Sequence, residues 1–246
     1  MTELVVTIIQ ARTGSTRLPR KVLMDVSGRP MLARVVERAK RSKLGRRIVV
    51  ATTVMPEDDE IVSLCGTNSW PCFRGSETDV LDRFFRAAQS FLADVVVRIT
   101  SDCPLIDPHL VDDVIRVLVE RREELDYVSN NLPPRSFPRG LDVEAIRFSA
   151  LKRAWEEDSN PQWREHVTQY IRRHPEKFRL KGITNASDYS EMRWTVDTHD
   201  DLEFARTIYA HFGHDRFSWR DVLSALQQHP QWQELNRNVV QKPEPP

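Results

Sequence analysis

Three basic side chains and a glycine gather in one short stretch near the start of the chain. Residues 10–23 read Gln-Ala-Arg-Thr-Gly-Ser-Thr-Arg-Leu-Pro-Arg-Lys-Val-Leu. Arg12, Arg17 and Lys21 supply positive charge, and Gly14 lets the backbone N–H groups approach a ligand closely. Two hydroxyl groups follow the glycine. This composition is typical of a loop that binds phosphate groups.

The loop lacks the two best-known phosphate-binding patterns. It has neither the Gly-Lys-Ser/Thr ending of a P-loop nor the Gly-x-Gly-x-x-Gly of a dinucleotide-binding fold, so both of those site types are excluded. Its composition alone leaves an ordinary basic surface loop as an equal alternative.

Charge is distributed unevenly along the chain. Residues 1–50 contain 12 Lys and Arg against 3 Asp and Glu, although the whole chain has 36 of each. Because the chain is neutral overall and aromatic residues do not alternate with the basic ones, a small phosphorylated ligand is favoured over nucleic acid. A solvated basic helix is the simpler alternative.

Length and composition are those of a globular protein. The 246 residues, 40% hydrophobic and 29% charged, can form one large α/β domain or two small ones. No apolar stretch reaches the roughly 20 residues that cross a bilayer, and the start Met1-Thr2-Glu3 lacks the charged-then-apolar layout of a signal peptide. We therefore expect a cytoplasmic protein without membrane contact. Cys65, Cys72 and Cys103 are an odd number without a close pair, which predicts reduced thiols.

Strands and helices alternate through the first half of the chain. Continuous β-branched runs predict buried parallel strands at Leu4–Ile9, Ile48–Thr52 and Asp94–Ile99, with another strand near Tyr127. Apolar spacing predicts helices over residues 32–45, 56–64, 79–91 and 108–124. This order predicts an α/β fold, a mostly parallel sheet with helices on both faces.

The second half is less regular. The patterns predict strands at 141–146, 178–183 and 193–196, and helices at 149–157, 163–173, 200–212 and 219–227. No linker separates two domains. We therefore expect one domain over residues 1–240, in which 132–183 form an inserted segment, and a flexible proline-rich tail at 241–246.

Six motifs, in order, resemble the cytidylyltransferases that activate acidic sugars. The resemblance is to the spore coat polysaccharide biosynthesis (SpsF) branch, which is related to acylneuraminate and 3-deoxy-manno-octulosonate cytidylyltransferases. The motifs are residues 9–23, 73–83, 98–108, 137–144, 164–168 and 193–198. Two departures are visible: Arg20 stands where the first loop usually has glycine, and Gln169 stands where proline is common.

The resemblance implies a Rossmann-like nucleotidyltransferase sheet and transfer of CMP from CTP to a hydroxyl of an acidic, nonulosonate-like sugar, with release of pyrophosphate. It implies that Lys21, Arg12 and Asp102 are catalytic, and that Lys21 stabilises the leaving pyrophosphate. It also implies that Asp102 and Asp197 hold Mg²⁺, which prefers carboxylate oxygens. Capping of a turn or helix is the simpler explanation for either aspartate.

Binding residues follow from the same resemblance. For the nucleotide they are Ala11, Arg12, Gly14, Ser15, Arg17, Lys21, Arg74, Gly75, Ser76 and Thr100. For the sugar they are Arg139, Asp142, Glu144, Arg164, Glu165 and His166, because an arginine that pairs with a substrate carboxylate would select an acidic sugar. A helical histidine is more often structural than catalytic. His166 is therefore a candidate for a structural hydrogen bond as well as for a catalytic base.

The sequence is also compatible with other acceptors, with a non-catalytic role and with more than one oligomeric state. The same fold could transfer a nucleotide to a sugar phosphate, an alcohol or a phosphonate, or it could bind nucleotide without turnover. Lys21, Asp102 and Asp197 argue against mere binding. Related enzymes commonly pair through the inserted segment, which here carries the aromatic residues Phe137, Trp155, Trp163 and Tyr170, so we expect a homodimer. Packing of these aromatic rings inside one chain is the alternative.

Overall fold

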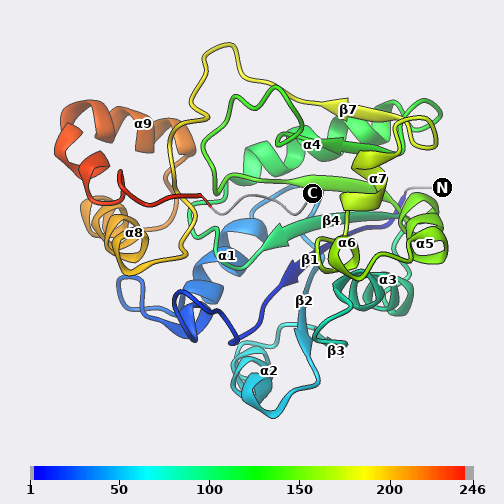
Figure 1. Ribbon diagram of the computed structural model, residues 1–246. Coiled ribbons are helices and arrows are strands. Elements are labelled where there is room, and N and C mark those ends of the chain that lie inside the picture. The colour runs from blue at the N-terminus through cyan, green and yellow to red at the C-terminus, as the bar shows by residue number, and fades with distance from the viewer. Residues whose placement is uncertain (1–2, 242–246) are drawn as a thin grey trace.

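The computed structural model describes residues 3–241, which contain a seven-stranded sheet of order β3-β2-β1-β4-β6-β5-β7 (Figure 1). The strands are β1 (Val5–Gln10), β2 (Ile48–Thr53), β3 (Cys72–Gly75), β4 (Val95–Thr100), β5 (Tyr127–Ser129), β6 (Glu144–Arg147) and β7 (Leu180–Gly182). β1 pairs in parallel with β2 and β4, β2 with β3, and β5 with β7. Only β6 is antiparallel to its neighbours, so the predicted mostly parallel sheet is confirmed.

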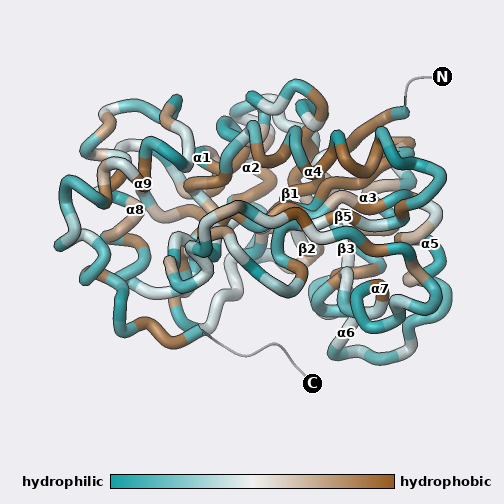
Figure 2. The backbone as a smooth tube through the Cα atoms, turned by 90° about the horizontal axis from the view of Figure 1, so that it is seen from above, coloured by the Kyte–Doolittle hydropathy of each residue, from teal (hydrophilic) through white to brown (hydrophobic). Residues whose placement is uncertain are grey.

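Helices cover both faces of the sheet, and Figure 2 shows the hydrophobic strands between them. One face packs against α1 (Met31–Ala39), α2 (Asp59–Thr67) and α4 (Pro108–Glu120). The other packs against α3 (Val80–Ser90), α5 (Phe148–Glu157), α6 (Pro161–Glu165) and α7 (Gln169–Arg173). Neighbouring strand residues, such as Ile8 and Ile9, enter opposite core clusters. The central strands are therefore continuous apolar runs because they are buried on both faces.

The last two long helices form a third core cluster at one end of the sheet (Figure 1). α8 (His199–Phe212) and α9 (Trp219–Gln228) pack there around the fully buried Trp194. Three short 3-10 helices complete the described elements: η1 (Lys21–Leu23), η2 (Pro56–Asp58) and η3 (Pro230–Glu234).

The structure differs from the sequence analysis in three local features. β3 was not foreseen, because four residues that include Arg74 and Gly75 carry little strand signal. Residues 193–196 make only an isolated bridge between Arg193 and Arg139, since their apolar side chains pack into the third core cluster. The single helix expected at 163–173 is two short helices, separated where Val167 has a left-handed φ of 57°.

The aromatic residues that suggested a dimer surface pack within the chain. Phe137 and Tyr170 are 5% and 6% exposed. The ring of Trp155 stacks on Phe85 at 4.2 Å, and Trp163 packs against a core cluster. That premise for the homodimer was therefore wrong, and the homodimer itself stays a prediction.

The inserted segment is part of the main sheet, because residues 132–183 supply β6 and β7. Of the tail expected at 241–246, only Gln241 is among the described residues, and 242–246 lie outside them. All three cysteines are free thiols. Within residues 3–241 no helix has the length and apolar character to span a membrane.

Candidate active site

A cavity of about 780 Å³ lies at the carboxyl ends of β1 and β4, whose last residues, Gln10 and Thr100, line it. From β1 the chain builds the sheet outwards through β2 and β3, and then returns to place β4 on the other side of β1. This reversal is the topological switch point, where open α/β sheets bind ligands. The loops after both strands enter the cavity and bring Ala11, Gly14, Ser15 and Asp102 to its wall.

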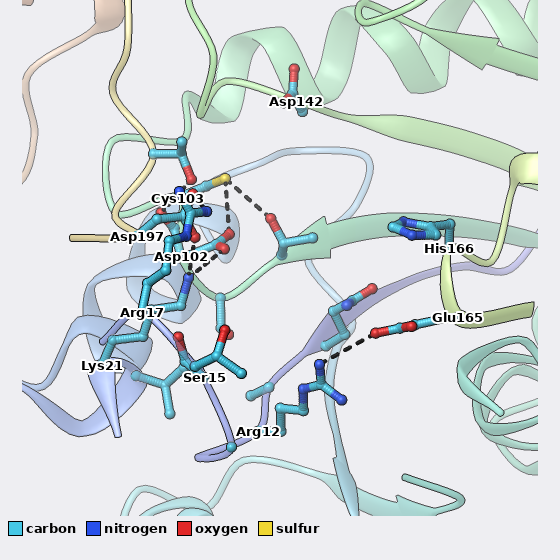
Figure 3. A pocket seen from close by; sticks show the side chains of 18 of the residues that line it. Arg12, Ser15, Arg17, Lys21, Asp102, Cys103, Asp142, Glu165, His166 and Asp197 are labelled. Carbon is cyan, nitrogen blue, oxygen red and sulfur yellow. Dashed lines mark hydrogen bonds and ion pairs between the residues drawn. The ribbon is translucent and has the colours of Figure 1, made fainter. Parts of the chain in front are cut away.

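Lys21 lies between the two aspartates that were expected to hold a metal ion (Figure 3). As the first residue of η1, it donates hydrogen bonds of 2.8 Å from Nζ to Asp102 Oδ2, to Asp197 Oδ1 and to the carbonyl oxygen of Val196. Its side chain is only 10% exposed. Three distant segments thus meet at one buried ammonium group.

Charge pairing keeps this group of side chains ionised. Burial alone would raise the pKa of Asp102, but the Lys21 ammonium and hydrogen bonds from Thr100 and Cys103 outweigh burial and hold this pKa at about 2. Burial likewise opposes the charge on Lys21, but the two carboxylates raise its pKa above the usual value. At neutral pH the ammonium and the Asp102 carboxylate are both charged.

Asp197 has further cationic partners. Its Oδ2 contacts Arg17 at 2.8 Å and Arg193 at 2.7 Å. Arg193 is fixed from behind by Asp201, which it contacts through Nε at 2.9 Å and through Nη2 at 3.1 Å. Asp201 also forms the capping box of α8 with Thr198. The N-terminus of α8 therefore sets the position of Asp197.

Helix capping does not account for either aspartate. The capping residue of α8 is Thr198, and α4 is capped by Asp107, whose carboxylate accepts backbone hydrogen bonds. Asp102 and Asp197 instead line the cavity.

The phosphate-loop candidate is held in place by a buried aspartate that sequence reasoning assigned only to a helix start. Asp58, 2% exposed, accepts hydrogen bonds from the backbone N–H and the hydroxyl of Thr13 at 2.8 and 2.7 Å. Its other carboxylate oxygen accepts from the Thr52 and Thr53 hydroxyls at the end of β2. Because Thr13 precedes Gly14, Asp58 fixes the loop relative to the sheet.

Four residues expected to bind the sugar also line the cavity: Arg139, Asp142, Glu165 and His166. Glu165 contacts Arg12 at 3.4 Å, away from Lys21 in Figure 3. Arg139 is placed by Gly140, which has a φ of 103° and lies so close to Thr195 that a Cβ would be 2.4 Å from the Thr195 nitrogen. Only glycine allows this approach.

A smaller cavity of about 170 Å³ adjoins the first and shares Thr100, Arg139, Asp142 and His166 with it. Its wall contains four arginines, Arg98, Arg135, Arg139 and Arg172, against the carboxylates of Asp142 and Glu144. Basic groups outnumber acidic ones, so this chamber favours an anionic group.

Several expected site residues serve the scaffold instead of the cavity walls. Arg74, Gly75, Ser76 and Arg164 are not in the lining of either cavity. The Arg74 guanidinium binds the carbonyl oxygens of Thr53 and Met55 and pairs with Asp59. Arg164 pairs with Asp79. Glu144 lines the smaller cavity, but it is 2% exposed and bound by Arg98, Tyr127 and Thr168.

Arg83 lines the main cavity and was not foreseen as a site residue. It comes from α3, is 1% exposed, and donates from Nη1 to the carbonyl oxygen of Ser76 at 2.7 Å. Burial lowers its pKa to about 10, so it stays charged at neutral pH. The only available signal was its position at the end of the 73–83 motif. Gln10, Cys103 and Thr195 were missed although they lie inside the recognised motifs, and Gln162 of α6 was missed because it lies outside them.

Comparisons with known proteins agree with this geometry. The family model for cytidylyltransferases matches residues 6–233. An uncharacterized protein of Methanocaldococcus jannaschii is 39% identical over 97% of this chain and 96% of its own length. The spore coat polysaccharide biosynthesis protein SpsF of Bacillus subtilis is 31% identical over 91% of this chain and 94% of its own length.

Two further similarities concern proteins described by their activity. The 3-deoxy-manno-octulosonate cytidylyltransferase of Polynucleobacter necessarius is 41% identical over 47% of this chain and 46% of that enzyme. The solved structure of a cytidylyltransferase from Leptospira borgpetersenii has a TM-score of 0.91 and 31% identity, covering 98% of this chain and 100% of that one. The segment that matches the family model runs from within β1 to beyond α9 and contains Lys21, Asp102 and Asp197, and this chain belongs to the cytidylyltransferase family of nucleotidyltransferases.

Proposed function

We propose that this enzyme transfers CMP from CTP to a hydroxyl group of an acidic sugar and releases pyrophosphate, for the synthesis of a surface polysaccharide. The observation that carries the proposal is the convergence of Lys21, Arg17, Asp102 and Asp197 at the switch point of a cytidylyltransferase sheet. The name of one relative, a 3-deoxy-manno-octulosonate cytidylyltransferase, supports the acidic sugar, and the name of another, a spore coat polysaccharide biosynthesis protein, supports the polysaccharide.

The main cavity is large enough for both substrates, since ligand pockets typically measure about 300 to 1,000 Å³. Ala11, Gly14, Ser15 and Thr100 line it and are available to the nucleotide. The sugar hydroxyl attacks the α-phosphorus in line and loses its proton to solvent, while the bond to the bridging oxygen breaks and pyrophosphate leaves. Catalysis of such a step depends on positioning and on neutralising charge.

Basic residues of the first loop neutralise the leaving pyrophosphate. Lys21 and Arg17 belong to this loop and the short helix that follows it, and Arg12 lies further along the same cavity wall. Arginine offers a planar fork of donors and lysine a compact charge, so together they match a chain of phosphate oxygens. Charge on the leaving group grows in the transition state, which makes this stabilisation catalytic.

Asp102 and Asp197 are suited to hold Mg²⁺. Their carboxylate oxygens converge on a single point, now taken by Lys21 Nζ, and oxygen donors are what this ion prefers. Residues 3–241 contain no group of three or more acidic, histidine or cysteine ligands. Two carboxylates, with phosphate oxygens as further ligands, are the usual set for magnesium with a nucleotide. When bound, the ion supplies positive charge to the reacting phosphates.

The acceptor occupies the part of the main cavity that the sugar-binding candidates line. Arg139 offers its guanidinium to the sugar carboxylate, and Asp142, Glu165 and His166 offer acceptors and donors to hydroxyl groups. Glu144 and Arg164 support this part of the cavity from behind by tying β6 to β4 and α6 to α3. A second candidate acceptor, a sugar phosphate or a phosphonate, is favoured by the four arginines of the smaller cavity.

The test is a pyrophosphate-release assay that combines each of the four nucleoside triphosphates with acidic sugars, sugar phosphates, alcohols and phosphonates. We expect release with CTP and an acidic sugar only. Release with a phosphorylated acceptor alone would replace the acidic sugar by the second candidate. Tight CTP binding without release from any acceptor would instead support a non-catalytic binding protein.

The metal assignment has its own test. Asp102→Asn and Asp197→Asn keep side-chain volume but remove the charge that attracts a divalent ion, so we expect each to lower turnover at least a hundredfold in a protein that still folds. Turnover that is independent of magnesium, or is unchanged in both variants, would remove the two aspartates from the metal site.

A further inference from the structure

The Nζ atom of Lys21 occupies the point at which the carboxylates of Asp102 and Asp197 converge. Asp102 Oδ2, Asp197 Oδ1 and the carbonyl oxygen of Val196 each lie 2.8 Å from its nitrogen. An ammonium group has three hydrogens, and each of them has one of these oxygens as its acceptor. Any other cation that binds both carboxylates would need the place that Lys21 Nζ takes.

The surrounding charges already balance. Lys21, Arg17 and Arg193 face the carboxylates of Asp102, Asp197 and Asp201, three positive charges against three negative ones. A divalent cation that approaches this set meets neutralised carboxylates and three nearby positive charges. Its binding is therefore weak until one or more of these basic groups moves away.

The three basic groups differ in how firmly they are held. Arg193 is 8% exposed and bound to both oxygens of Asp201, so it stays with Asp197. Arg17 is 33% exposed and contacts the carboxylates only through Asp197. Lys21 carries its ammonium group at the end of an unbranched, rotatable four-carbon stem. Arg17 and Lys21 can turn towards the cavity, where both are lining residues, while Arg193 keeps Asp197 in position.

Only another anion can take Lys21 from its carboxylates, because a buried ammonium without a partner is strongly unfavourable. The proposed substrate brings such an anion into this cavity, since a triphosphate carries several negative charges beside Lys21 and Arg17. Exchange of partners keeps every charge paired: the ammonium moves from carboxylate to phosphate, and the two carboxylates become available to a divalent ion.

We propose that Lys21 blocks the divalent-ion site between Asp102 and Asp197. The site forms only when a triphosphate binds the Lys21 ammonium in place of the two carboxylates. This inference rests on the proposed function for its nucleotide, and it assigns Lys21 a role before the chemical step. The enzyme then binds its metal with or after the nucleotide, and nucleotide and metal each raise the affinity for the other.

The test measures binding of Mn²⁺ alone, by electron paramagnetic resonance, to the free protein and to Lys21→Met. Methionine is close in length to lysine and carries no charge. We expect wild-type protein to bind Mn²⁺ weakly and Lys21→Met to bind it at least tenfold more tightly, because the carboxylates have lost their partner. Asp102→Asn in the Lys21→Met protein should abolish the gain, which places the new site at this pair.

A matched control separates this local effect from a general loss of positive charge. Arg12→Met removes a cation from the same loop, but Arg12 pairs with Glu165 and does not contact the carboxylates. Its Mn²⁺ affinity should stay within twofold of the wild-type value. If Lys21→Met does not fold, Lys21→Gln provides the same comparison, since its amide still donates to a carboxylate without charge.

Equal Mn²⁺ affinity in the wild-type, Lys21→Met and Lys21→Gln proteins would overturn the proposal that Lys21 blocks the divalent-ion site. So would tight Mn²⁺ binding to the wild-type protein without nucleotide. This assay needs neither acceptor nor turnover, so it is independent of the acceptor screen. Absence of pyrophosphate release in that screen would count against the proposed function while leaving the Mn²⁺ result interpretable.

Discussion

Arg20 adopts a left-handed backbone conformation, with a φ of 61°, immediately before η1. This is the loop position where the resembling family usually has glycine, the residue that accepts positive φ without a steric penalty. In an arginine the conformation costs roughly 1–2 kcal/mol. The compensating ion pair with Glu60 is more than half exposed on both sides and contributes little.

Arg20→Gly should therefore stabilise the protein. We expect its free energy of unfolding to exceed that of Arg20→Ala by about 1 kcal/mol, because both variants lose the Glu60 pair and only glycine relieves the backbone. Urea unfolding of the two variants measures the difference. If Arg20→Ala proved the more stable, the left-handed conformation would not be a source of strain.

Individual site residues could be named from sequence, but their contacts could not. Lys21, Asp102 and Asp197 stand in motifs that the family resemblance identifies, and the cavity contains all three. The bond between Lys21 and Asp197 joins residues 176 positions apart. Such a contact depends on how β1, β4 and α8 are packed, which no local pattern encodes. Arg74 is the opposite case. Its motif predicted a nucleotide-binding residue, but its guanidinium binds the carbonyl oxygens of Thr53 and Met55 at the end of β2.

At the scale of elements, η2 connects the end of β2 to the phosphate loop through Asp58. Asp58 lies near the start of the helix predicted over residues 56–64, where proline and acidic residues are common. Its carboxylate makes no helix-capping bond and instead binds Thr13, Thr52 and Thr53. Burial would raise its pKa, but these hydrogen bonds outweigh burial and lower it.

Asp58→Asn should cost about 2 kcal/mol of unfolding free energy, because the amide cannot accept all of these hydrogen bonds. The folded-state pKa is lowered, so the stabilisation is complete above the ordinary value of 3.8 and is lost as pH falls through the folded-state pKa. Denaturant unfolding at pH 7 and in acid measures this loss. Asp59→Asn, which alters an exposed pair with Arg74, is the control and should change stability by less than about 0.5 kcal/mol. A pH-independent difference between wild type and Asp58→Asn would contradict the assignment.

β3 and α3 meet at Gly75, and this contact positions Arg83. A Cβ on Gly75 would lie 2.9 Å from Arg83 Cγ, so Gly75→Ala must displace the arginine stem. We expect a loss of about 1–3 kcal/mol and weaker nucleotide binding, measured by unfolding and by calorimetry. In an Arg83→Ala background the same substitution should cost much less.

Gly66→Ala provides the opposite control. Gly66 lies in α2 with nothing within 4 Å of an added Cβ, so alanine should stabilise the helix by about 0.5–1 kcal/mol. A Gly75→Ala protein as stable as Gly66→Ala would show that Arg83 moves aside freely.

The long, strongly patterned elements were predictable and the short ones were not. β1, β2 and β4 are six-residue strands built mainly of β-branched and apolar residues, and α3 and α8 have clear apolar spacing or caps. The segment at 193–196 has a strand-like pattern, yet Trp194 and Val196 face the α8 and α9 cluster without a partner strand. Burial imposes the same alternation on an extended loop as on a strand, so the pattern alone cannot separate them.

At the scale of the whole molecule, the surface offers little for apolar association. The exposed large hydrophobic residues of the described chain are Leu44, Val54, Met55, Leu92, Leu235 and Val240. None of them lies in residues 132–183, the segment expected to form the dimer. A contact through this segment would therefore be mainly polar.

The homodimer stays a prediction, and the contact between its two chains is expected to be mainly polar. We expect sedimentation at low salt and micromolar concentration to give the mass of two chains, and added salt to shift the protein towards a single chain because it screens polar and charged contacts. A single-chain mass at low salt would exclude the homodimer. Association that salt strengthens would place an apolar contact outside residues 132–183.

The order of the strands also governs how the sheet meets other chains. Both edges are short: β3 has four residues and β7 has three, whereas the six-residue, mainly apolar strands β1, β2 and β4 each lie between two paired neighbours. An edge of this length presents few free N–H and C=O groups for strand addition. The segments most prone to form amyloid-like contacts become accessible only when the sheet itself opens, so aggregation should follow global unfolding and not fraying at the edges.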